Sequence, residues 1–188
     1  MNAFDMLERV EFQASAYNPQ IARILALDGD GFRPIPLAPR APLSDAACRE
    51  LDQYTAAELF PEALSPSGAL SGLYLYFGCL DKAHSIAQDL NTKEGSFWHG
   101  IMHRQEPDPA NAAYWFRQVG RHPIFPDLRE EAHRQRFVTG AEWNPFEFIE
   151  FCESARMRPG SEEERLAMRI QLAEWQLLFD YCAREKSL

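Results

Sequence analysis

The sequence predicts an all-α fold in which antiparallel helical hairpins pack as a compact right-handed bundle or short superhelix. The first observation is that proline follows a helix-capping residue at four places: Asn18-Pro19, Ser65-Pro66, Asp108-Pro109 and Asn144-Pro145. This pair is typical of a helix start, because the N–H that proline lacks would have no partner there. The second observation is that no segment alternates with the two-residue period of a strand.

Ten helices are expected in chain order, at about residues 2–15, 19–28, 44–59, 66–77, 81–90, 95–105, 109–119, 126–138, 145–157 and 161–185. Four of them begin at the proline pairs. The last begins at Ser161-x-x-Glu164, which is a capping-box pattern. Its apolar residues recur at helical intervals and predict one buried stripe: Leu166, Ile170, Ala173, Leu177 and Tyr181.

The chain is expected to form a single helical domain over residues 1–188, since its length and its 46% hydrophobic content suffice for one core. We divide it into a proline-rich connector at 28–43, a repeat-like core at 66–123 and C-terminal helices at 126–185. The connector contains four prolines between Asp28 and Pro42, so it cannot be regular helix. It is expected to be an extended loop over the surface, either a simple connector or an arm that docks a partner.

Charge and composition exclude several classes of partner. The net charge of −9 disfavours nucleic acid, since an acidic surface repels phosphate backbones. No apolar run is long enough to cross a membrane, and residues 1–12 do not resemble a secretory signal. The four cysteines are far apart and match neither a zinc spacing nor a small disulfide framework. We therefore expect buried free cysteines and a cytoplasmic location, and leave the oligomeric state open.

Residues 66–123 resemble the tetratricopeptide family. The pattern is carried by Gly100-x-x-His103, Ala112-x-x-x-Phe116 and Pro123, with a weaker copy in Gly72-x-x-Leu75 and Ala83-x-x-x-Ala87. The small residues would let two antiparallel helices approach closely, and Phe116 would fill the space beside them. The leading Trp and Leu of the pattern are out of register. The resemblance implies paired helical hairpins and, as a function, the binding of peptides or proteins.

The segment from Phe97 to Phe125 is the candidate functional site, because it holds three of the five histidines and two of the four tryptophans. Its local charge is slightly positive in an acidic chain, which suits an acidic ligand. His99 and His103 lie four residues apart and share one helix face, at places where a hairpin normally buries apolar groups. The candidate ligand-binding residues are His99, His103, Arg104, Tyr114, Arg117 and His122.

A divalent metal site is the alternative prediction for the same face. Two imidazoles at this spacing can chelate one ion, and Glu106 follows one turn later. The predicted metal ligands are His99, His103 and Glu106, with His84 and His122 as possible additions. Residues 100–102 contain no carboxylate, so the helical zinc-protease motif is missing.

Two functions therefore remain open. The first is a binding module whose His, Arg and aromatic pocket at 97–123 holds a protein, a peptide or a small acidic ligand. The second is a metal-dependent enzyme or metal-binding protein that uses His99 and His103. The chain has no phosphate-binding glycine loop and no nucleophile elbow.

Overall fold

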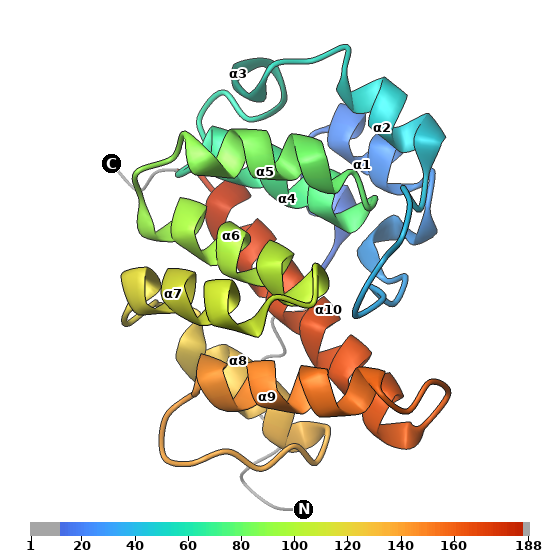
Figure 1. Cartoon of the computed structure of the whole chain (residues 1–188). Coiled ribbons are helices and arrows are strands. Elements are labelled where there is room, and N and C mark those ends of the chain that lie inside the picture. The colour runs from blue at the N-terminus through green and yellow to red at the C-terminus, as the bar shows by residue number, and fades with distance from the viewer. Residues whose placement is uncertain (1–11, 186–188) are drawn as a thin grey trace, which may run out of the picture.

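The computed structural model describes residues 12–185 and confirms an all-α fold over that range. The helices are α1 (Pro19–Leu25), α2 (Asp45–Leu51), α3 (Ala56–Leu59), α4 (Pro66–Tyr76), α5 (Leu80–Gln88), α6 (Lys93–Gln105), α7 (Pro109–Val119), α8 (Phe125–Arg134), α9 (Pro145–Arg156) and α10 (Glu162–Ala183). They pack directly on one another (Figure 1). None of the described helices is long and apolar enough to span a bilayer.

Helix α10 runs through the middle of the molecule, between the α4–α6 side and the α8–α9 side (Figure 1). The predicted buried stripe is only partly confirmed: Ile170 and Ala173 are buried, and Leu166, Leu177 and Tyr181 are partly buried. Because α10 has neighbours on both sides, it also buries residues outside that stripe. Trp175 and Phe179, which lie outside that stripe, are fully buried and stack at 5.1 Å. The indole N–H of Trp175 donates to the carbonyl of Gly72 at 2.7 Å, which ties α10 to α4.

Helices α4 to α7 pack consecutively, each against the next. Two glycines permit close approaches between helices, and the approach at Gly100 is the one that the sequence predicts. A Cβ at Gly100 would lie 2.7 Å from the ring of Phe116, so α6 and α7 depend on its absence. A Cβ at Gly72 would lie 2.7 Å from the side chain of Trp98, so the close contact between α4 and α6 also requires glycine at this position.

The predicted helix starts are largely confirmed. Asn18, Asp108, Asn144 and Ser161 each accept a hydrogen bond from the first turn of their helices. Ser65 precedes α4 as predicted, but its side chain accepts no such bond. The Glu164 carboxylate accepts from the N–H of Gly160 at 2.6 Å and not from that of Ser161, so the capping box is only half formed.

Two predicted helices differ from the structure. Residues 44–59 form two helices, α2 and α3, because Thr55 and Glu58 close a full capping box that starts a new helix. The predicted helix at 2–15 falls mostly outside the described residues. Within its described part the chain forms a single 3-10 turn at Ala14–Ala16.

The connector at 28–43 is irregular, as predicted, apart from a 3-10 turn at Gly29–Gly31. It is more than a surface loop. Ile35 and Leu37 are buried, and the side-chain amide of Gln171 on α10 donates to the carbonyls of Ile35 and Pro36 at 3.2 Å. This segment therefore belongs to the packed interior on one side.

The prediction of four free cysteines is wrong. Cys48 on α2 and Cys79, just before α5, form a disulfide with a Cα–Cα distance of 6.5 Å. The two residues are 31 positions apart, and only the packing of α2 against the α4–α5 turn brings them together. Cys152 and Cys182 are free and buried, as expected.

Candidate functional site

Three histidines converge between α5 and α6. His84 comes from α5, and His99 and His103 come from successive turns of α6. One ring nitrogen of each lies within 4.8 Å of one nitrogen of the other two. The His84 ring centre is 4.6 Å from that of His99 and 5.6 Å from that of His103. Three potential nitrogen ligands thus face a common point.

Helix α7 covers this histidine cluster from the other side. The indole of Trp115 stacks on the His99 ring, with ring centres 4.1 Å apart and planes within 6°. The side-chain nitrogen of Asn111 lies 3.2 Å from Nε2 of His103. Asn111 and Trp115 are four residues apart on one helix, so both face α6. They fix the two α6 rings without filling the point that the three histidines share.

Glu106 sets the orientation of His103. Its carboxylate lies 2.9 Å from Nδ1 of His103, close enough to accept the Nδ1 proton. With its proton on Nδ1, the ring presents the lone pair of Nε2 on its other side, where Asn111 contacts it. A carboxylate behind an imidazole in this way is the usual outer partner of a metal-bound histidine.

His99 is the most deeply buried member of the cluster. Its exposed fraction is 1%, and its Nδ1 atom has no hydrogen-bond partner within residues 12–185. Burial, together with His84 and His103 beside it, lowers the pKa of His99 to about 4. The ring is therefore neutral at pH 7, which is the state that binds a metal.

Arg104 lies elsewhere, although it follows His103 directly. Its guanidinium is fully buried between α6 and α10, where it pairs with Glu174 and contacts Gln171. It also lies 4.6 Å over the ring of Phe148. Because Glu174 already neutralises it, Arg104 holds helices together and is separate from the histidine cluster.

The remaining predicted residues are not brought together with the cluster either. His122 is buried, with Nε2 3.7 Å from the carboxylate of Glu94 at the opposite end of α6. Arg117 is exposed and lies over the ring of Phe146. Tyr114 is half exposed and touches the edge of Trp115. The site is thus smaller than the predicted pocket at 97–123.

A cavity of about 800 Å³ lies beside the C-terminal end of α6. Its walls are Pro36–Arg40 of the connector, Leu80 at the start of α5, Gln105–Pro107, and residues of α9 and α10. Glu106 belongs both to this wall and to the histidine cluster. Gln105 is buried on the same wall, and neither atom of its amide group has a partner in the described part of the chain.

Sequence reasoning placed His84 only among the possible ligands and gave no role to Asn111 and Trp115. The signal for the latter two was their i,i+4 spacing on the helix after α6, which puts both on the face toward His99 and His103. No protein-family model, curated protein or solved structure matches the chain.

Proposed function

We propose that this protein binds a divalent transition metal, with Zn²⁺ as the best fit, through His84, His99 and His103. The observation that carries the proposal is the convergence of three imidazoles from two adjacent helices. Nitrogen ligands suit zinc, and three of them leave a fourth position for water. This is the ligand number of catalytic zinc sites, and it leaves metal-dependent hydrolysis as an extension of the proposal.

The distances support a site that closes on the ion. A tetrahedral zinc with Zn–N bonds of about 2.0 Å places its nitrogens roughly 3.3 Å apart. The three nitrogens lie within 4.8 Å of one another, so each pair needs to close by about 1.5 Å at most. Small rotations of the half-buried His84 and of His103 achieve this, while Trp115 holds His99 in place.

The contacts indicate what each residue contributes to the metal site. His99 is already neutral and fixed by stacking. His103 presents Nε2 because Glu106 accepts its Nδ1 proton, and Asn111 gives up its contact with that Nε2 when the metal binds. Glu106, predicted as a ligand, is better placed as the outer partner of His103 than as a ligand itself.

Calorimetric titration with Zn²⁺ at pH 7, on protein purified without a histidine tag, tests the proposal. We expect one site per chain in the native protein and its loss in His84→Ala and His103→Ala. His133→Ala on α8 is the matched control, because that residue lies outside the cluster and should leave binding unchanged. No zinc binding in the native chain, or equal binding in all four proteins, would remove the proposal.

A second candidate is a binding pocket for a peptide or a small acidic ligand, at the 800 Å³ cavity. The unpartnered amide of Gln105 suits a ligand amide, and Arg40 on the same wall suits a carboxylate. N-acetylglutamate carries both groups and is a suitable probe. We expect Gln105→Ala and Arg40→Ala each to weaken its binding in a calorimetric titration, and an absence of heat in the native protein would count against this pocket.

The tetratricopeptide-like character of residues 66–123 stays a proposal. It is supported by the consecutive packing of α4 to α7 and by the contact of Gly100 with Phe116. A cytoplasmic location also stays a proposal. The disulfide between Cys48 and Cys79 weakens it, because such bonds persist mainly in oxidising compartments.

A further inference from the structure

A second pocket, of about 450 Å³, lies next to the 800 Å³ cavity, shares Arg40 with it, and borders the Cys48–Cys79 disulfide. Both cysteines line it, and each keeps an exposed fraction of 7%, whereas the two free cysteines keep 2% or less. The other walls are connector residues 39–42 and the starts of α2 and α5. The disulfide is therefore buried in the fold but borders this pocket.

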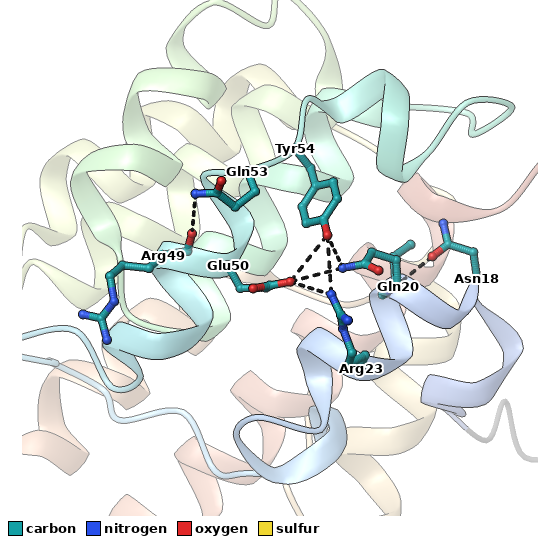
Figure 2. A network of polar contacts seen from close by, with 8 residues as sticks. Asn18, Gln20, Arg23, Arg49, Glu50, Gln53 and Tyr54 are labelled. Carbon is teal, nitrogen blue, oxygen red and sulfur yellow. Dashed lines mark hydrogen bonds and ion pairs between the residues drawn. The ribbon is translucent and has the colours of Figure 1, made fainter.

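The pocket carries arginine side chains with no partner. Arg40 and Arg49 both line it, and within residues 12–185 neither guanidinium has a hydrogen bond or ion pair. Figure 2 shows Arg49 extending away from the polar network of α1 and α2, in which Glu50 is bound by Arg23. Only the backbone carbonyl of Arg49 takes part there, as acceptor from Gln53. Its charge is thus free to attract an anion.

Two acidic residues also line the wall, and within residues 12–185 neither forms an ion pair with Arg40 or Arg49. Asp45 and Asp81 lie in the first turns of α2 and α5. Helix N-termini attract carboxylates, so both charges are already offset in part by backbone N–H groups. Lys82 on the same wall is bound to Asp52, which lies outside the pocket.

We propose that the Cys48–Cys79 bond is a reactive disulfide, exchanged by small anionic thiols that enter this pocket. The free arginines attract the carboxylates of the thiol and bring its sulfur to the bond at the pocket wall. Cations that line the same pocket also favour the thiolate form that exchange produces. The site is independent of the histidine cluster.

The two sulfurs have different roles. Cys79 occupies the N-cap of α5, and although its side chain forms no capping hydrogen bond, the helix dipole favours negative charge there and makes Cys79 the better leaving group. The incoming thiolate therefore attacks Sγ of Cys48. A new S–S bond forms there, the bond to Cys79 breaks, and Cys79 leaves as a thiolate that takes a proton from water.

A second thiol completes the exchange. Its thiolate attacks the external sulfur of the mixed disulfide, which releases Cys48 as a thiolate and forms a small-molecule disulfide. Cys48 then takes a proton from water. Two external thiols are oxidised by two electrons in total, and the protein disulfide is reduced to two thiols.

The experiment compares two thiols on the native, full-length protein without denaturant. Glutathione carries carboxylates, and 2-mercaptoethanol is neutral. Samples are quenched with iodoacetamide, and the modified peptides are identified by mass spectrometry. We expect both thiols to open the disulfide in the folded chain, with the first mixed disulfide on Cys48. Cys152 and Cys182 should stay unmodified.

The charge dependence is tested with Arg40→Ala and Arg49→Ala, and with Arg158→Ala as the control. We expect each pocket variant to slow the glutathione reaction by about three- to tenfold, with the 2-mercaptoethanol rate unchanged. Opening only at denaturant concentrations that unfold the chain would overturn the proposal. Four free thiols in protein purified in air would also overturn it. So would a pocket variant that changes the glutathione and 2-mercaptoethanol rates equally.

Discussion

At the scale of single residues, Glu106 carries the most specific prediction for the metal site. Its carboxylate accepts the Nδ1 proton of His103 and so keeps Nε2 available. Losing such an outer partner weakens metal binding by about 10- to 100-fold. We expect Glu106→Ala to weaken Zn²⁺ binding by roughly tenfold or more in a chelator competition titration. Glu130 is an exposed carboxylate on α8, so the control variant Glu130→Ala should bind Zn²⁺ as the native chain does. An unchanged Zn²⁺ affinity in Glu106→Ala would refute the role of Glu106.

The lowered pKa of Glu94 predicts how the free energy of unfolding depends on pH. His122 beside it holds the pKa of Glu94 at about 2, below the ordinary 4.5. Because the folded-state pKa is depressed, the unfolded chain binds more protons between these values, and the stabilisation is lost as the pH falls from 4.5 toward 2. The pair contributes about 3 kcal/mol at most above pH 5.

Denaturant titrations of the native chain and of Glu94→Gln, at pH 6 and pH 3, measure this contribution. The difference in unfolding free energy should be clearly smaller at pH 3 than at pH 6. A difference that stays constant between the two values would show that the carboxylate is not held by His122. Metal should be removed with a chelator beforehand, so that the histidine cluster does not add its own pH dependence.

Individual side chains also mark the limit of sequence reasoning. The shared face of His99 and His103 follows from their spacing alone. The convergence of His84 depends on how α5 packs on α6, and the inward turn of Arg104 depends on Glu174, which lies 70 residues further along the chain. No local pattern reports these long-range partners, so Arg104 was assigned to a ligand site it does not join.

At the scale of elements, the contact between α6 and α7 places Trp115 and Asn111 against the rings of His99 and His103. Gly100 allows it, since an added Cβ would lie 2.7 Å from Phe116. We expect Gly100→Ala to lower the free energy of unfolding by about 1–2 kcal/mol, because overpacking outweighs the gain in helix propensity. Gly140→Ala, with nothing within 4 Å of the added atom, should change it by less than about 0.5 kcal/mol. Thermal or chemical denaturation gives both values, and a stabilised Gly100→Ala would contradict the close approach.

Most helix positions follow from local chemistry, and the exceptions have local or long-range causes. Proline and a capping side chain predict the starts of α1, α7 and α9 to the residue. The break between α2 and α3 has a local signal in Thr55 and Glu58, a capping box inside a predicted helix. The burial of α10 on more than one face has no such signal, because it results from neighbours on both sides.

At the scale of the whole molecule, α10 links two hydrophobic clusters. Trp175 and Phe179 belong to the larger cluster, and Ala167 and Ile170 belong to the smaller cluster with α8 and α9. A helix shared in this way couples the two, so we expect one cooperative unfolding transition, consistent with the predicted single domain. Differential scanning calorimetry checks it; two resolved transitions would mean that the clusters unfold separately.

The central claim concerns the three imidazoles, and X-ray absorption at the zinc edge tests it most directly. The sample is tag-free protein loaded with one equivalent of Zn²⁺, with His99→Ala as the comparison. The account predicts a four-coordinate zinc with three imidazole ligands and one further light atom at about 2.0 Å, reduced to two imidazoles or lost in the variant. A shell of oxygen atoms alone, or a spectrum unchanged by His99→Ala, would contradict it.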